Sequence, residues 1–315
     1  MAKNVLELRR YHNPAVKSTI KIHKFLLYFG FIQIIPGFNT FAQDTNEKSY
    51  YDHIKAAIGY DINNYSKKYI LEKELTEISG LSYYKKNQLA CVEDEDGKVF
   101  IYDLKRKKII QTIKFGKKGD YEGVETVGKE VFVLRSDGKV FNFSMQDAPD
   151  VEATSWKTPL SEKNDVEGFG YVKEEGHLLL ACKEKSKVDD KKSKGKAIYR
   201  FDIKTKQLIS KPFVDLKIEK LNDFLESKQV KFKKIKEFKP SAVATHPKTK
   251  QTFVVASVGK LLVILGKDRD LKHVIPLDPK MFLQPEGICF APDATMYISS
   301  EGQDGEGYIL EFSYR

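Results

Sequence analysis

The sequence contains only three cysteines and one tryptophan, and its one long apolar run is the 11 residues 25–35. So few cysteines exclude a small domain held together by disulfides, and a single tryptophan excludes a propeller built from WD-type repeats. The apolar run is shorter than the roughly 20 residues that a membrane-spanning helix needs. With 41% apolar side chains in 315 residues, the chain still has enough hydrophobic material for a large folded core.

The excess of basic residues is confined to two segments of the chain. Residues 1–42 hold six Lys or Arg and one Glu, and residues 183–239 hold 19 basic and nine acidic residues. The remainder carries 29 basic and 34 acidic residues, so the body of the protein is mildly acidic. Binding to nucleic acid, which needs a positive surface, therefore loses its support.

The N-terminal segment has the layout of a secretory signal peptide. A basic stretch precedes the apolar run 25–35, and small residues at the spacing of a signal-peptidase site end at Ala42. We therefore expect residues 1–42 to be removed and residues 43–315 to reside in the periplasm or cell envelope. The long basic stretch leaves open an uncleaved segment that anchors the protein in the inner membrane.

The three cysteines lie in apolar stretches that look like buried strands. Cys91 and Cys182 each follow an alanine, and Cys289 lies between Ile288 and Phe290. We expect three small buried hydrophobic side chains, without a disulfide and without a nucleophilic thiol.

A five-residue signature recurs along the chain: an acid or amide, an apolar residue, Glu or Ser, Gly or Ala, and an apolar residue. The central positions of the five copies are spaced by 43, 45, 74 and 45 residues. The period is thus about 45 residues, with an excess in the third unit. The central residues are Ser79, Glu122, Glu167, Ser241 and Glu286.

Each unit contains short alternating strands joined by tight turns such as Asp96-Gly97 and Asp137-Gly138. Four strands every 45 residues are typical of a β-propeller blade. The sequence therefore predicts an all-β, five-bladed propeller over residues 67–315, after a lead-in at 43–66. Six blades are the alternative if the excess in the third unit hides one. The last unit has room for only three strands, so we expect residues 67–75 to supply its fourth strand and to close the ring.

The excess in the third unit forms a basic insertion at residues 186–238. It contains a lysine-rich loop at 186–196 and apolar residues at helical spacing over 218–225. One interpretation is a solvated loop and a small helix packed on the rim. The other is a surface that docks a partner or an anionic membrane.

The five signatures, together with LLLACKEK at 178–185 and PEGICF at 285–290, resemble the SdiA-regulated family of YjiK-like exported propellers. The resemblance covers roughly residues 67–315. It implies a propeller of the bacterial envelope, linked to quorum-sensing regulation and calcium homeostasis, with no established reaction. The insertion in the third unit and Lys239, which occupies the acidic position of the fourth signature, depart from the family pattern.

The first strand of each propeller blade lines the central channel, so the signature residues are expected to form a ring. Hard oxygen ligands without His or thiolate suit Ca²⁺, with Mg²⁺ as the alternative. The expected metal ligands are Glu122, Glu167, Glu286, Asp120 and Glu77. The opposing interpretation is structural, with each carboxylate accepting backbone N–H groups of the next blade. Asp165 and Gln284 occupy the same place as Asp120 in their blades.

A second ring is expected where the second strands end in charged residues. Mixed charge at a funnel mouth suits a polar or anionic ligand, and it also suits salt bridges between blades. The weak catalytic candidates are Lys183, Glu184, Glu301, Arg135 and Glu93, and the ring further includes Asp94, Lys185 and Ser257.

We therefore expect a monomeric binding module that holds a divalent cation and presents a charged face to an unknown ligand or envelope protein. We expect binding in preference to catalysis. The alternative from another class is a metal-assisted hydrolase, an esterase or phosphodiesterase, that uses the same channel. A third possibility is a structural interaction protein without an ion.

Overall fold

The computed structural model describes residues 38–145, 148–184, 186–188, 191–192, 195–230, 232–302 and 305–315. Residues 39–315 form one compact unit, which is described below. The predicted signal peptide, residues 1–42, lies mostly outside the described residues. No described helix is long and apolar enough to cross a membrane.

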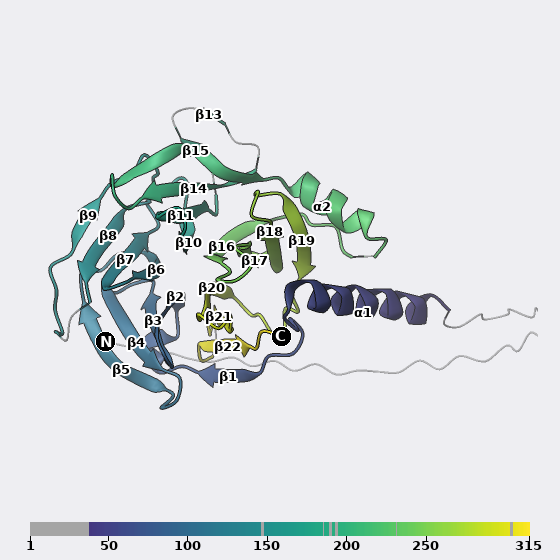
Figure 1. The fold of residues 1–315 in the computed structure, drawn as a ribbon, viewed down its shortest axis with the longest axis horizontal. Coiled ribbons are helices and arrows are strands. Elements are labelled where there is room, and N and C mark those ends of the chain that lie inside the picture. Colours follow the sequence, from purple (N-terminus) through teal and green to yellow (C-terminus); the bar gives the residue numbers. More distant parts are fainter. Residues whose placement is uncertain are drawn as a thin grey trace, which may run out of the picture. The chain divides into compact units, whose positions relative to one another are not determined.

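The unit consists of five four-stranded antiparallel sheets arranged around a central axis, which confirms the five-bladed propeller (Figure 1). Blade 1 contains β2 (Ile78–Lys85), β3 (Gln88–Glu93), β4 (Lys98–Asp103) and β5 (Lys108–Lys114). Blade 2 contains β6 (Tyr121–Val127), β7 (Glu130–Arg135), β8 (Val140–Ser144) and β9 (Thr154–Trp156). Blade 3 contains β10 (Val166–Val172), β11 (His177–Cys182), β14 (Lys196–Asp202) and β15 (Gln207–Leu216). Blade 4 contains β16 (Lys239–Thr245), β17 (Thr252–Val258), β18 (Leu261–Leu265) and β19 (Leu271–Pro276).

Blade 5 joins the two ends of the domain, as the sequence predicts. It contains β20 (Pro285–Phe290), β21 (Met296–Ser300), β22 (Tyr308–Phe312) and, from the N-terminal side, β1 (Lys67–Ile70). β1 pairs antiparallel with β22, with Lys67 opposite Glu311. The closing strand is shorter than the predicted 67–75, because the short 3₁₀ helix η1 (Lys73–Leu75) follows it and buries Leu75. This turn carries the chain from the outer edge of blade 5 to the inner strand of blade 1.

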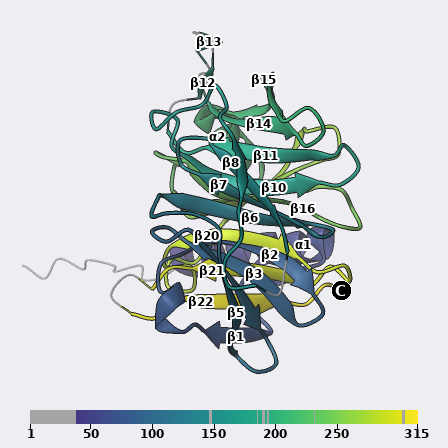
Figure 2. The same cartoon turned by 90° about the vertical axis from the view of Figure 1, so that its left-hand side faces the viewer.

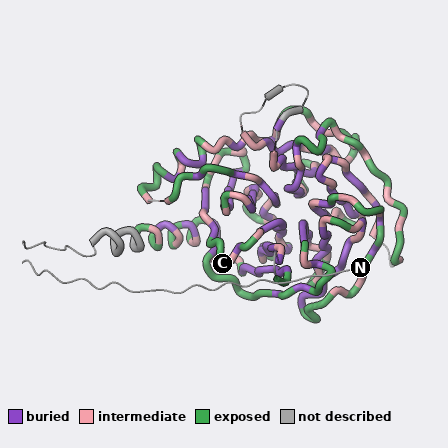
Figure 3. Tube along the Cα trace, turned by 180° about the vertical axis from the view of Figure 1, so that it is seen from behind, coloured by how far each residue is buried: buried purple, intermediate pink, exposed green. Residues whose placement is uncertain are grey.

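The innermost strands β2, β6, β10, β16 and β20 each contact the innermost strands of both neighbouring blades (Figures 1 and 2). Glycine in the signature permits this close approach. A Cβ atom on Gly80 would lie 2.7 Å from the Cα of Gly123, and one on Gly123 would lie 2.3 Å from the Cβ of Phe169. The buried residues accordingly concentrate on the blades (Figure 3).

The excess in the third unit does not hide a sixth blade within the described residues. It contains the two-stranded hairpin β12 (Lys187–Val188) and β13 (Lys191–Lys192), a long β15, and helix α2 (Ile218–Ser227). α2 confirms the helix predicted at 218–225. Leu221 and Leu225 are buried, and the Asn222 side chain bonds both the N–H and the C=O of Ile235 at 2.8 and 3.0 Å.

Helix α1 (Phe38–Ile58) was not predicted from the sequence. Tyr50, Ile54 and Ile58 are buried at a spacing of four residues, and the Tyr50 hydroxyl donates to the carbonyl of Val274 at 2.7 Å. The buried stripe is a single narrow line of residues, so the hydrophobic pattern of the helix is weak. α1 therefore packs on the propeller as part of the lead-in.

The three cysteines are free and buried, as predicted. Burial raises the pKa of the Cys91 and Cys182 thiols, so they stay protonated at neutral pH.

Candidate functional site

The signature residues share a feature that the sequence did not reveal: each lies at a β-bulge. The pairing register between the first and second strands skips Ser79, Glu122, Glu167, Ser241 and Glu286. A bulge leaves one residue unpaired in the ladder and redirects its side chain. The same irregularity therefore leaves the central position of the signature unpaired in all five blades.

The two serines of this ring join blades. The Ser79 hydroxyl donates to the carbonyl of Tyr121 at 2.7 Å, and the Ser241 hydroxyl donates to the carbonyl of Pro285 at 2.7 Å. Each acceptor lies in the first strand of the next blade. The serines thus join neighbouring blades as donors, a contact that the sequence interpretation, which concerned carboxylate acceptors, did not include.

The three glutamates contact side chains instead. Glu122 is hydrogen-bonded to Asp120, Glu167 to Lys183, and Glu286 to Gln284. Glu167 and Glu286 are 6% and 8% exposed. The Oε2 atom of Glu167 is buried and has no hydrogen-bond partner among the described residues. At least one carboxylate oxygen of the ring is thus free to accept a ligand.

The three carboxyls influence one another electrostatically. Burial, followed by repulsion from Glu167, holds the pKa of both Glu122 and Glu286 well above the usual range. Burial also raises the pKa of Glu167 to about 7, although the Lys183 ammonium opposes this shift. The three carboxyls therefore lie within electrostatic reach of one another, in a region that disfavours their charged forms.

Lys183 supplies a positive charge inside this ring. Its ammonium bonds the Glu167 carboxylate and lies 3.9 Å from Asp165. Burial lowers the pKa of Lys183, but the attraction of Glu167 outweighs this effect and raises it overall. Lys183 extends from the end of β11, where the sequence placed it in the second ring.

More acidic groups gather at this end of the channel, which we call the acidic mouth. Burial, together with repulsion from Asp94 and Glu77, raises the pKa of Glu301 to about 7. Burial and the neighbouring Glu77 and Asp120 likewise raise the pKa of Asp94. The acidic mouth comprises Glu77, Asp94, Asp120, Glu122, Asp165, Glu167, Glu286 and Glu301.

Other members of the predicted second ring have local structural contacts. Glu93 accepts the backbone N–H groups of Glu95 and Asp96 at 3.0 and 2.6 Å, which fixes the turn after β3. Arg135 and Asp137 form a two-bond ion pair at 3.1 and 2.7 Å in the turn after β7.

The remaining members of that ring lie near blade 4 or outside the described part. Glu184 pairs with Lys239, the residue that departs from the acidic pattern of the signature. Ser257 is buried. Lys185 lies outside the described residues.

The donor set fits a hard cation in charge and chemistry, although no cation geometry is preformed. Within the described ranges, no group of three or more His, Cys, Asp or Glu side chains is arranged to hold a metal ion. Carboxylate oxygens are the ligands that Ca²⁺ and Mg²⁺ prefer. A bound cation would relieve the mutual repulsion of Glu122, Glu167 and Glu286 and give Glu167 Oε2 a partner.

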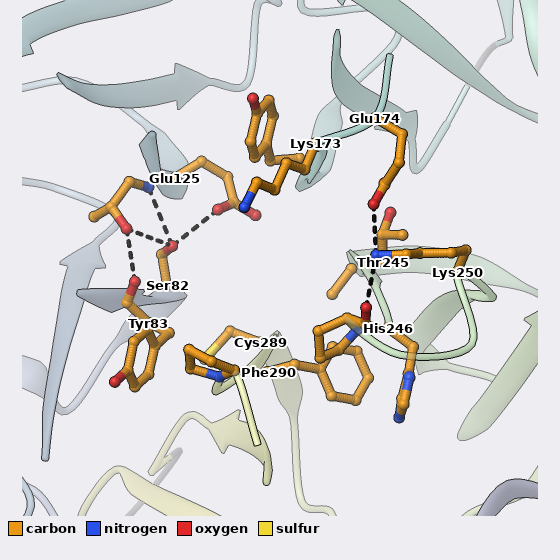
Figure 4. Close-up of a pocket in the computed structure, with 15 residues that line it drawn as sticks. Ser82, Tyr83, Glu125, Lys173, Glu174, Thr245, His246, Lys250, Cys289 and Phe290 are labelled. Atoms are coloured by element: carbon orange, nitrogen blue, oxygen red, sulfur yellow. Dashed lines mark hydrogen bonds and ion pairs between the residues drawn. The ribbon is translucent and has the colours of Figure 1, made fainter. Parts of the chain in front are cut away.

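The opposite end of the channel contains a pocket of about 400 Å³ that sequence analysis missed (Figure 4). It lies where the innermost strands end, three and four residues beyond the signature positions. Extending the repeat by those residues would have identified it. Its lining includes Ser82, Tyr83, Glu125, Thr126, Tyr171, Ala244, Thr245, Cys289 and Phe290.

Glu125 is the buried acid of this pocket. It is 9% exposed, and it accepts a hydrogen bond from the Ser82 hydroxyl at 2.8 Å and another from the backbone N–H of Tyr171. Burial raises the pKa of Glu125 to about 8 in spite of these bonds. The group is therefore mostly protonated at neutral pH when the pocket is empty.

His246, on the far wall of the pocket, has a structural role. Its Nδ1 atom accepts the backbone N–H groups of Lys248 and Thr249, and its Nε2 atom lies 2.8 Å from the Tyr60 hydroxyl. Burial lowers the pKa of His246 to about 4, so the ring is neutral. It ties the lead-in to blade 4.

Comparison with known proteins gives a family. None of the curated proteins matches the chain. Among solved structures, a luciferin-regenerating enzyme is 10% identical with a TM-score of 0.44, covering 76% of this chain and 91% of that one. Hydrazine synthase of Kuenenia stuttgartiensis is 13% identical with a TM-score of 0.44, covering 74% and 83%. A Bacteroides thetaiotaomicron protein of unknown function is 13% identical with a TM-score of 0.46, covering 78% and 58%.

These likenesses are too distant to bear on activity. The sequence-family match is more specific, because it extends over residues 61–304 and so includes all five signatures. It confirms the resemblance inferred from the signatures. The chain therefore belongs to the SdiA-regulated family.

Proposed function

We propose that the protein is a cation-binding propeller whose acidic mouth holds one divalent cation, Ca²⁺ in preference to Mg²⁺. The observation that carries this proposal is that Glu122, Glu167 and Glu286, all at bulges, lie within electrostatic reach of one another, with Lys183 bonded to Glu167 and Lys260 within reach of Glu286. The three carboxyls outnumber these two lysines, so protons or a further cation must balance the remaining negative charge.

The residues of this chain would hold the cation through carboxylate oxygens. Glu122, Glu167 and Glu286 are the first candidates, with Asp120 and Glu77 beside them. Ca²⁺ accepts irregular sets of six to eight oxygens, whereas Mg²⁺ demands a near-ideal octahedron. Side chains from four separate blades favour the more permissive ion. Because Lys183 pairs with Glu167, its ammonium competes with the cation for the same carboxylate.

The protein acts, in this proposal, as an exported binding module of the cell envelope. Cleavage after Ala42 would remove the first five residues of α1 and keep its described buried residues Tyr50, Ile54 and Ile58. A link to calcium homeostasis or to quorum-sensing regulation would follow from the family resemblance. The basic residues of the insertion then offer a second surface for an envelope partner or an anionic membrane.

A metal-assisted hydrolase at the same mouth is the second candidate. Glu301 favours it, because it lies beside the ring, hydrogen-bonded to Gln284 and within electrostatic reach of Glu286. A carboxylate beside a bound cation can take a proton from a water molecule. The first candidate needs no such step.

A calorimetric titration with CaCl₂ tests the cation site. We expect the full-length protein to bind Ca²⁺ saturably. Glu122→Gln and Glu286→Gln should each bind Ca²⁺ at least about tenfold more weakly than the parent. Glu226→Gln removes one exposed acid from α2 and serves as the control, with unchanged binding. Equal binding by all four proteins, or none by the parent, would refute the site. Turnover of an ester or phosphodiester that depends on Glu301 would favour the hydrolase.

A further inference from the structure

The pocket at the opposite end of the channel from the acidic mouth has properties of its own. Its volume of about 400 Å³ is that of a small organic molecule and far exceeds a metal ion. It presents a single buried acid, Glu125, so it lacks the several oxygen ligands that a Ca²⁺ ion requires. A ligand of molecular size is therefore the suitable occupant.

Glu125 forms no ion pair with the described residues, although Lys173 belongs to the same lining and its side chain extends toward Glu125 in Figure 4. Burial, the Ser82 hydroxyl and the backbone amides of Tyr171 and Thr126 are the influences on its pKa. Buried carboxylates in proteins are normally paired with a positive charge. A ligand bound in the pocket can therefore supply the positive charge that pairs with Glu125.

Part of the pocket lining is aromatic, with Phe290 packed against His246 on the far wall. Tyr83, Tyr171 and Phe290 line the pocket, and Figure 4 shows Tyr83 and Phe290 on the side opposite Glu174. Aromatic faces attract organic cations through the negative charge of the ring, and they also pack against carbon atoms. The hydroxyl of Thr245, also in the lining, is buried without a hydrogen-bond partner in the described part of the chain.

We propose that this pocket binds a small organic ammonium ion, whose charged group pairs with the Glu125 carboxylate while its carbon atoms pack against Tyr83, Tyr171 and Phe290. The site is separate from the cation at the acidic mouth. The two sites lie at opposite ends of the innermost strands, about 10 Å apart for three residues of β-strand. Neither site depends on the other.

Other charged and titratable groups face Glu125 across the pocket. Tyr171 and Cys289 feel its charge directly, and each has a raised pKa caused first by burial. Lys250 is neutralised by Glu174 at 2.5 Å, His246 is neutral, and Lys173 lies exposed on the rim. The exposed Lys173 is thus the one cation of the lining without a paired acid among the described residues, and water screens it.

Because the ligand needs ionised Glu125, its affinity should depend on pH. Burial raises the pKa of Glu125 to about 8, so a cation must displace a proton below that pH. The dissociation constant should fall by about tenfold per pH unit between pH 6 and 8 and then level off. A neutral ligand would show no such dependence.

The test is calorimetric or NMR titration of the full-length protein in EDTA with three probes: methylammonium, tetramethylammonium and benzylammonium. Benzyl alcohol is the neutral analogue of the third. We expect at least one ammonium to bind saturably at pH 8.5, with benzyl alcohol at least tenfold weaker than benzylammonium.

Two substitutions locate the binding. Glu125→Gln should weaken ammonium binding by about 30-fold or more and abolish the pH dependence. Glu122→Gln, at the acidic mouth, should leave it unchanged, as should Glu226→Gln on α2. Matched far-ultraviolet circular dichroism spectra confirm that each variant is folded. If Glu125→Gln unfolds, the pH dependence of the parent decides the question. No saturable binding of any ammonium, equal binding of benzyl alcohol, or a flat pH profile would overturn the proposal.

Discussion

The ammonium of Lys183 bonds the carboxylate of Glu167, two side chains of the same blade that meet at the acidic mouth. Lys183 comes from the end of β11, and Glu167 from the bulge at the start of β10. The lysine thus behaves as a tethered cation, which neutralises one of the three ring glutamates. The stability of the cation-free protein and its affinity for Ca²⁺ should both depend on how the negative charge of these glutamates is balanced.

Lys183→Met should destabilise the cation-free protein. Glu167 would lose its partner while remaining buried, and for a partly exposed pair the cost should be about 1–3 kcal/mol at pH 7.5. Urea unfolding in EDTA measures this effect. Adding Glu167→Gln to Lys183→Met should recover most of the loss. Lys183→Met should also bind Ca²⁺ more tightly, because the competing ammonium is gone, and weaker binding would contradict the account.

The stability of the cation-free protein should fall as pH rises. Glu167 has a pKa of about 7 in the folded protein, above its ordinary value of 4.5. A raised folded pKa means that the folded state holds the proton more tightly, so this contribution is present below pH 4.5 and is lost as pH rises to 7. We expect the free energy of unfolding to drop by about 1–3 kcal/mol over that range in EDTA. Ca²⁺ should remove much of the drop, and a stability that rises through the range would contradict the prediction.

The sequence predicts the architecture well because each blade of a propeller corresponds to one copy of a sequence repeat. The signature positions, the Asp-Gly turns and the closing strand at Lys67 follow from a 45-residue period, whereas the bulges do not. The contacts within the ring cannot be predicted from the repeat. Ser79 and Glu122 occupy the same position in their blades, yet Ser79 bonds a backbone carbonyl and Glu122 bonds a carboxyl group. Helix α1 was missed because only Tyr50, Ile54 and Ile58 mark its buried face.

The two serines of the ring should contribute to stability through bonds between blades. Ser79→Ala and Ser241→Ala each leave a buried carbonyl, of Tyr121 or Pro285, without its donor. We expect each substitution to cost about 1–2 kcal/mol in urea unfolding. Ser313→Ala is the control, because its partner Ser66 is exposed and its loss should be near zero. Equal effects at all three sites would rule out the bonds as the cause.

Helix α1 should be part of the folded domain. Ile54 is 2% exposed, so Ile54→Ala should lower the free energy of unfolding by about 2–4 kcal/mol. Asp52→Ala, at an exposed position two residues away, should change it by less than about 0.5 kcal/mol. If the two variants were equally stable, α1 would not belong to the core.

The most direct test of the central claim is the metal content of the protein purified without chelator, followed by its melting temperature with EDTA and with added Ca²⁺. We predict about one equivalent of calcium per chain and a melting temperature that falls in EDTA and recovers with Ca²⁺. Absence of metal together with an unchanged melting temperature would contradict the cation site, and protons together with Lys183 and Lys260 would then balance the charge of Glu122, Glu167 and Glu286.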